Sequence, residues 1–185
     1  PLRKVDSFKH LETSGLLKTS NRFDVIAYSL AEAYSMTMRD VNRYLAELLR
    51  ARPLVVDTRG GFGNDWVQAF ADVGLIPVML AMKVADPNAY KAVVQDYRVE
   101  LLYQAFEKSD EAMDFMDGTW GSYIRFEEGA SPSEEDKKAA RTELLEALIY
   151  GIWCNDANNP KRQHSYQVIG RSWGFDSLPR LAKII

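Results

Sequence analysis

Cysteine and histidine, the residues most often used in redox and metal sites, are scarce in this chain of 185 residues. It contains one cysteine, Cys154, and two histidines, His10 and His164. A single cysteine cannot form an intramolecular disulfide, and neither histidine has neighbours at the spacing of metal ligands. We therefore expect no metal site, a buried structural thiol at Cys154, and histidines that lie at the surface or cap a helix.

Long apolar runs are also missing. The longest, Gly74–Met82, is about half the ~18 residues that suggest a membrane span, and it contains Pro77. The N-terminal residues do not form a charged region followed by an apolar one, as a secretion signal would. Together with the lone cysteine, these features predict a cytoplasmic protein that makes no membrane contact.

Recognisable catalytic patterns are absent as well. The chain has no G-x-x-x-x-G-K-[ST] loop and no lysine in a glycine-rich turn, so the usual phosphate cradle of nucleotide hydrolases is missing. The acidic run Glu134–Asp136 lies where a helix is expected to begin, and negative charge stabilises a helix start. We therefore predict that the chain is not an enzyme and requires no cofactor.

Helical signals dominate what is present. Apolar residues make up 46% of the chain and charged residues 26%, as in ordinary soluble domains. Their spacing predicts a mostly α fold with at most a few short strands. We expect an N-terminal region, 1–63, and a helical C-terminal region, 64–185, for dimerisation or partner binding, with one continuous domain as the alternative. Helices are expected at about 22–50, 66–73, 86–108, 110–117 and 131–153, strand-like pieces at 54–57 and 123–126, a polar loop at 155–164, and either a strand or a helix at 74–84.

Two helix starts carry specific signals. Asp86 followed by Pro87 is typical of an N-cap and the first helical residue. The sequence Ser-Pro-Ser-Glu at 131–134 predicts Ser131 as the N-cap of the last long helix, with Glu134 closing a capping box.

The most specific pattern lies in Ala27–Ala46 and predicts two short helices joined by a tight turn. Ala31 is small, as a close crossing of two helices requires, and Thr37 can cap the second helix. Ser35 stands where such a turn usually has glycine, which is a departure from the pattern. The positions expected to point inward are Leu30, Tyr34, Met36, Val41 and Tyr44.

With its flanks, this segment resembles the winged helix-turn-helix DNA-binding regulators over residues 22–63. In that family the second helix enters the DNA major groove. The resemblance implies a wing formed by Leu54–Asp57 and the turn Thr58–Gly63, with Arg59 at its tip. It also implies a role in transcription regulation through duplex DNA, as a homodimer. The DNA-binding residues expected on this basis are Thr37, Met38, Arg39, Asn42, Arg43 and Arg59.

Part of the charge distribution supports DNA binding, and part of it opposes DNA binding. Residues 1–63 contain ten Lys and Arg against seven Asp and Glu, whereas residues 64–185 contain thirteen against nineteen. A basic N-terminal region suits contact with a polyanion. Asp40 and Glu47, however, lie on or near the proposed reading helix and would repel phosphate.

A second resemblance involves the segment 54–80. LVVDTRGG at 54–61, followed by ADVGLIPVML at 71–80, is similar to the Walker-B half of ParA- and MinD-like ATPases. In that family an apolar strand ends in an aspartate near the metal, and a later strand ends in a turn containing proline. Because the chain lacks a Walker A loop, the resemblance implies a non-hydrolysing relative.

Two classes of function fit the sequence better than catalysis does. The leading hypothesis is a regulatory protein that binds duplex DNA through a helix-turn-helix. The alternative is a non-enzymatic helical interaction protein without nucleic-acid binding, such as an inhibitor, immunity factor, adaptor or virion component. A sequence pI near 5.5 and the many aromatic residues favour this alternative.

Overall fold

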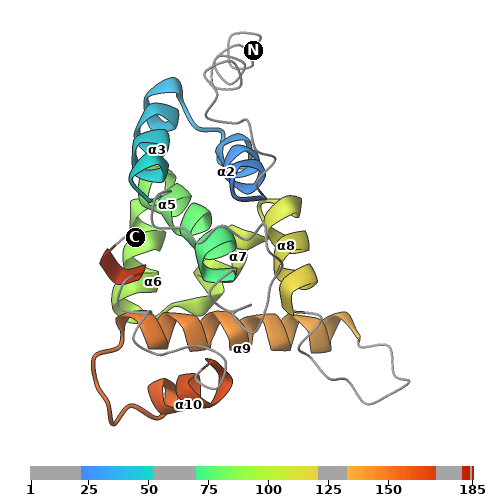
Figure 1. Cartoon of the computed structure of the whole chain (residues 1–185), viewed down its shortest axis with the longest axis vertical. Coiled ribbons are helices and arrows are strands. Elements are labelled where there is room, and N and C mark those ends of the chain that lie inside the picture. The colour runs from blue at the N-terminus through green and yellow to red at the C-terminus, as the bar shows by residue number, and fades with distance from the viewer. Residues whose placement is uncertain (1–21, 52–69, 121–132, 170–180, 184) are drawn as a thin grey trace.

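The structure is a computed structural model that describes residues 22–51, 70–120, 133–169, 181–183 and 185 (Figure 1). Every regular element among these residues is a helix, which confirms the mostly α fold. The strand-like pieces expected at 54–57 and 123–126 lie outside the described residues. The elements are α2 (Arg22–Ala33), α3 (Met38–Ala51), the π-helical turn η3 (Ala71–Leu75), α5 (Ile76–Ala85), α6 (Pro87–Asp96), α7 (Val99–Phe106), α8 (Asp110–Trp120), α9 (Glu134–Trp153) and α10 (Pro160–Ile169).

The helix α5 lies at the centre of the fold. α2 and α3 pack against it at one end of the molecule, α6 and α7 also contact it, and α9 crosses the other end with α10 beside it (Figure 1). All α5 residues from Ile76 to Met82 are buried. A helix that is apolar on every side is stable when other elements surround it. The segment 74–84, for which strand and helix were both open, is therefore a central helix.

The π-helical turn η3 precedes α5 and accommodates Pro77. The amide of Ile76 donates to the carbonyl of Ala71, five residues earlier, where a regular α-helix would use the residue four earlier. Proline has no amide hydrogen, and its ring clashes with the carbonyl four residues before it, here that of Val73. A wider turn relieves this clash, so the helical path continues through Pro77.

Three phenylalanines stack beside this turn. The ring of Phe70 lies 5.7 Å from the ring of Phe106 and 6.2 Å from that of Phe115, and all three are buried. Gly74 packs against them, because a Cβ atom at this position would lie 3.1 Å from Phe115 Cδ1. The missing side chain at Gly74 therefore allows η3 and α8 to approach closely.

The single helix expected over 86–108 is divided into α6 and α7, so its predicted extent was wrong. Its start is as predicted, since Asp86 is the N-cap and accepts a hydrogen bond from the amide of Ala89. The break falls at Tyr97, whose backbone is left-handed with φ of 56°. The Tyr97 ring stacks on Tyr150 of α9, with centroids 4.7 Å apart. Packing against α9 offsets the cost of the left-handed backbone, and no local sequence signal marks it.

The start of α9 also differs from its prediction. The N-cap is Ser133 and not Ser131, and Asp136 rather than Glu134 closes the capping box. Ser133 Oγ accepts from the amide of Asp136 at 3.1 Å, and the Asp136 carboxylate accepts from the amide of Ser133 at 3.0 Å. Both pairs have the required spacing of three residues, so the sequence alone could not separate them.

α10 begins at Pro160, inside the segment 155–164 that was expected to be a loop. Polar contacts connect it with α9. Lys161 Nζ donates to Glu146 Oε1 at 2.6 Å, and His164 Nε2 lies 2.9 Å from Glu143 Oε1. His164 is exposed, as expected for a surface histidine.

A bidentate ion pair joins α9 to α8. Arg141 donates from Nε to Asp117 Oδ1 at 2.7 Å and from Nη2 to Asp117 Oδ2 at 2.6 Å. Its Nη1 lies 3.5 Å from the hydroxyl of Tyr103 on α7. The hydrogen bond to Asp117 raises the pKa of Arg141 above its ordinary value. Two parallel hydrogen bonds also fix the angle at which the helices meet.

Candidate nucleic-acid interface

The turn between α2 and α3 is built around Ser35. Its backbone is left-handed, with φ of 48°. The amide of Ser35 donates to the carbonyl of Glu32 at 2.8 Å, and the amide of Met36 donates to that of Ala31 at 3.1 Å. These two bonds form a Schellman motif, which satisfies the last carbonyls of α2 and reverses the chain. The position where a helix-turn-helix usually has glycine is thus the one that adopts the left-handed conformation.

Thr37 caps α3, as its position in the sequence predicted. Its Oγ1 accepts from the amide of Asp40 at 3.3 Å, and the Asp40 carboxylate accepts from the amide of Thr37 at 3.3 Å. The hydroxyl of Thr37 also donates to Asp40 Oδ2 at 2.6 Å. This side-chain hydrogen bond lowers the pKa of Asp40 below its ordinary value. Asp40 therefore has a local role at the start of α3, in the manner of a capping box.

The residues expected to point inward are buried or half-buried. Tyr34 is half-buried, and the others form part of the hydrophobic core. The hydroxyl of Tyr44 donates to the carbonyl of Pro77 on α5 at 2.9 Å. Both α2 and α3 pack on α5, and this central helix positions them relative to each other. The close crossing of α2 and α3 expected at Ala31 is not formed, because the two helices make little direct contact and Ala31 is buried in the core instead. The fully buried or nearly buried inward residues are Leu30, Ala31, Met36, Val41 and Tyr44.

The opposite side of α3 is exposed. Arg39, Asn42 and Arg43 lie three and four residues apart, so they share one face of the helix. Thr37 and Met38 are exposed at its N-terminal end. The structure therefore brings together five of the six residues expected to contact DNA, and the sixth, Arg59, lies outside the described residues.

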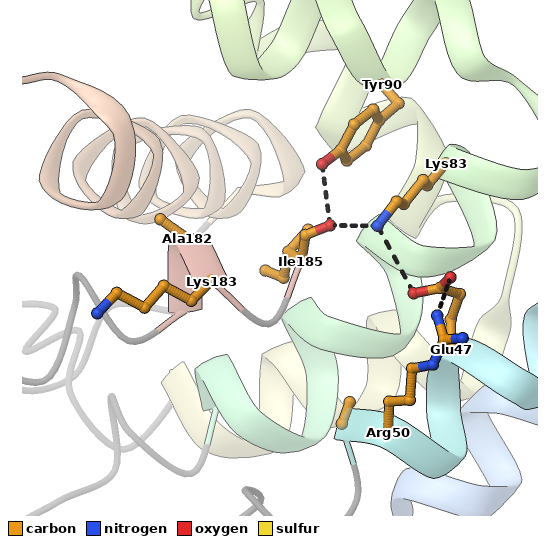
Figure 2. Close-up of a pocket in the computed structure, with 8 residues that line it drawn as sticks. Glu47, Arg50, Lys83, Tyr90, Ala182, Lys183 and Ile185 are labelled. Atoms are coloured by element: carbon orange, nitrogen blue, oxygen red, sulfur yellow. Dashed lines mark hydrogen bonds and ion pairs between the residues drawn. The ribbon is translucent and has the colours of Figure 1, made fainter.

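The two carboxylates of α3 are both engaged. Asp40 is bound by Thr37, and Glu47 lies between two cations (Figure 2). Glu47 Oε1 is 3.2 Å from Arg50 Nη1, and Glu47 Oε2 is 3.6 Å from Lys83 Nζ on α5. No local pattern predicts the contact with Lys83, because the two residues are 36 positions apart in the chain. Lys83 offsets the negative charge of Glu47, and this reduces the repulsion that Glu47 would exert on an approaching phosphate.

Exposed apolar side chains also concentrate on this part of the molecule. Among the described residues, the large hydrophobic side chains with the greatest exposure are Val25 and Tyr28 on α2 and Met38 and Leu49 on α3, which are 36% to 49% exposed. These side chains belong to two consecutive helices, and exposed apolar groups can contribute to a surface that contacts a partner.

Replacing Ser35 by glycine should stabilise the protein. A non-glycine residue in the left-handed region costs about 1–2 kcal/mol, part of which glycine loses again through its greater freedom in the unfolded chain. We expect the free energy of unfolding to rise by about 0.5–1 kcal/mol, measured by urea denaturation. Ser35→Ala is the matched control, since it keeps the backbone strain. Equal stability of the glycine and alanine variants would contradict the left-handed assignment.

Stability should fall at high pH because of two tyrosines at this corner. Burial raises the pKa of Tyr34 to about 12 and the pKa of Tyr44 well above its ordinary value of 10. Above pH 10 the unfolded chain therefore releases protons that the folded chain retains. The stabilising contribution is complete below pH 10 and is lost as the pH rises toward the folded-state values. Urea denaturation at pH 8 and pH 11 measures this loss, which should be smaller in Tyr44→Phe; an unchanged loss would contradict the role of Tyr44.

Other candidate chemistry is not assembled in the described part of the chain. No three His, Cys, Asp or Glu side chains within it come close enough to hold a metal ion. Cys154 is buried, as expected for a structural thiol. None of the described helices is both long and apolar enough to cross a membrane. The segment Ala71–Leu80, which would include a strand by resemblance to the ATPases, is helical.

Comparisons with known proteins add no family assignment. No protein-family model, curated protein or solved structure matches this chain. Any proposal about its function therefore depends on the geometry described above.

Proposed function

We propose that the chain is a DNA-binding regulatory protein that reads duplex DNA with the exposed face of α3. The observation that carries this proposal is the combination of a left-handed Ser35 turn with Arg39, Asn42 and Arg43 exposed together on the helix that follows it. In a helix-turn-helix, the second helix enters the major groove and contacts bases through its N-terminal residues.

The side chains on this face match the chemistry of base edges. Arg39 and Arg43 can each donate two hydrogen bonds to guanine, and Asn42 can form the paired donor and acceptor contact with adenine. Thr37 and Met38 lie at the N-terminal end of α3, where the apolar side chain of Met38 can contact the methyl group of thymine. The Thr37 hydroxyl donates to Asp40, so Thr37 would act by holding the start of α3 in place beside the DNA.

The packing beneath α3 suits this role. Two polar contacts connect α3 to α5. The Tyr44 hydroxyl in the middle of α3 donates to the carbonyl of Pro77, and Glu47, closer to the C-terminal end of α3, forms an ion pair with Lys83. A reading helix must be held rigidly, because small displacements weaken directional hydrogen bonds to bases. We further propose that the chain binds as a homodimer, with half-sites about one helical turn of DNA apart.

A selection from random duplex DNA tests the proposed function. The purified chain should enrich particular sequences, and fluorescence anisotropy on an enriched duplex should show that the affinity falls as salt rises from 50 to 200 mM. At the base pairs that α3 contacts, the enriched sequences should have guanine opposite the arginines and adenine opposite Asn42. Absence of salt-sensitive binding to any duplex would overturn the proposal.

The exposed apolar residues favour one other candidate, a protein-interaction surface on α2 and α3. A photoreactive amino acid placed at Ala46, which is exposed on α3, would detect such contact by crosslinking to a protein partner in cells. Crosslinking to protein at this position, together with no DNA enrichment, would favour the interaction protein. Crosslinking to DNA would favour the regulator.

A further inference from the structure

A third arginine extends the row of basic side chains on α3. Arg39, Arg43 and Arg50 are separated by four and then seven residues, and at about 3.6 residues per turn these spacings place them on one side of the helix. Ala46, which is also exposed, lies on the same side between Arg43 and Arg50. The buried residues of α3 lie on the other side, against the core. The three arginines therefore form a row along the exposed side of α3.

Arg50 extends into solvent and is held by one contact. Its side chain is 76% exposed, and its Nη1 donates to Glu47 Oε1 at 3.2 Å (Figure 2). Glu47 is less exposed, and its other carboxylate oxygen lies 3.6 Å from Lys83 Nζ. A guanidinium carries five hydrogens in a planar fork, so the hydrogen bond to Glu47 leaves most of them for another acceptor. Arg50 can therefore bind an anionic oxygen while Glu47 orients it.

The length of α3 determines what Arg50 can reach on DNA. At about 1.5 Å per residue, Arg50 lies roughly 10 Å along the helix from Arg43 and roughly 16 Å from Arg39. The major groove is about 12 Å wide and winds around the DNA axis, away from a short helix that lies in it. When Arg39 and Arg43 contact bases, Arg50 is therefore past the groove floor and beside the phosphates that border it. The small side chain of Ala46 lets the DNA backbone approach α3 between Arg43 and Arg50.

We infer that Arg50 binds a phosphate of the DNA backbone next to the bases that Arg39 and Arg43 read. Arg50 has this role only if α3 reads duplex DNA as proposed above, and its role differs from that of the other two arginines. Phosphate contacts set the register of a protein on DNA and carry no sequence information. Arg50 would therefore fix the position of α3 in the groove without contributing to the choice of sequence.

Fluorescence anisotropy with the full chain tests this role on the selected duplex and on a shuffled duplex of the same composition. Arg50→Ala should weaken binding to both duplexes by the same factor, about five- to tenfold at salt concentrations of about 100 to 200 mM. The slope of log affinity against log salt should become shallower by about one. The ratio of the two affinities should stay at its wild-type value, because loss of a base contact would weaken mainly the selected duplex.

Two further variants separate the contact from other effects of charge. Arg50→Lys keeps a cation that can bind phosphate as a point charge, so the salt slope should remain that of the wild-type chain. Lys91→Ala removes an exposed cation from α6 and should leave both affinity and slope unchanged. Arg50 lies in the last turn of α3, where a cation stabilises the helix end, so thermal unfolding is measured for every variant. If Arg50→Ala does not fold, Arg50→Gln decides.

An unchanged salt slope in Arg50→Ala would overturn the role of Arg50, and so would a loss of affinity confined to the selected duplex. Equal changes in Arg50→Ala and Lys91→Ala would also contradict it, because net charge would then explain the effect. Absence of duplex binding by the wild-type chain is a different result, which would refute the proposed function and the role of Arg50 with it.

Discussion

The double variant Arg39→Ala, Arg43→Ala should bind its selected duplex at least about a hundredfold more weakly than the wild-type chain. Each well-formed arginine–guanine contact contributes about 1–3 kcal/mol of discrimination, so loss of both is a large effect. Fluorescence anisotropy on the same duplex measures the change. If one arginine contacts phosphate instead of a base, its removal should lower the slope of log affinity against log salt by about one.

The fold should tolerate this double substitution. Both arginines are exposed, and surface substitutions of this kind usually change the free energy of unfolding by less than about 0.5 kcal/mol. Lys91→Ala, Lys183→Ala is a matched control, because it removes the same charge from exposed positions outside the proposed reading face. Equal loss of DNA binding in the control would mean that net charge, and not α3, determines affinity.

Gly74→Leu should strongly destabilise the folded chain. A Cβ atom at this position would already lie 3.1 Å from Phe115 Cδ1 and 3.4 Å from Phe70 Cε2. The three further carbon atoms of leucine have no space in the stack of Phe70, Phe106 and Phe115. We expect the free energy of unfolding to fall by about 3 kcal/mol, measured by urea denaturation. That is a large part of the ~5–15 kcal/mol typical of a whole domain.

Two further variants separate overpacking from a general effect on helix stability. In Gly118→Ala, the new Cβ atom would lie 3.9 Å from its nearest neighbour, Arg22 Nη1, so the substitution should be neutral or stabilising by up to about 1 kcal/mol. Adding Phe115→Ala to Gly74→Leu should recover part of the lost stability, because the two side chains compete for the same volume. Strictly additive destabilisation would contradict this explanation.

Local sequence signals predicted the two-helix corner well. Ser35, a departure from the usual glycine, still adopts the left-handed conformation. The inward positions and the cap at Thr37 follow from short-range spacing, and the structure has both. The same is true of Asp86 as an N-cap. Such features depend on hydrogen bonds between residues no more than five apart, so the sequence contains the information needed to place them.

Features that depend on distant contacts could not be predicted in this way. The break at Tyr97 is accompanied by stacking on Tyr150, and the central position of α5 depends on the elements that surround it. An apolar run as short as 74–84 fits either a buried strand or a buried helix. The pairing of Glu47 with Lys83 likewise joins segments far apart in the chain.

The most direct test of α3 as the reading helix is the change in backbone amide NMR shifts when the selected duplex is added. We predict that the largest changes fall on Thr37 to Arg43, with α9 and α10 unaffected. Changes concentrated on α9 and α10, with the N-terminal half of α3 unperturbed, would contradict the proposed function.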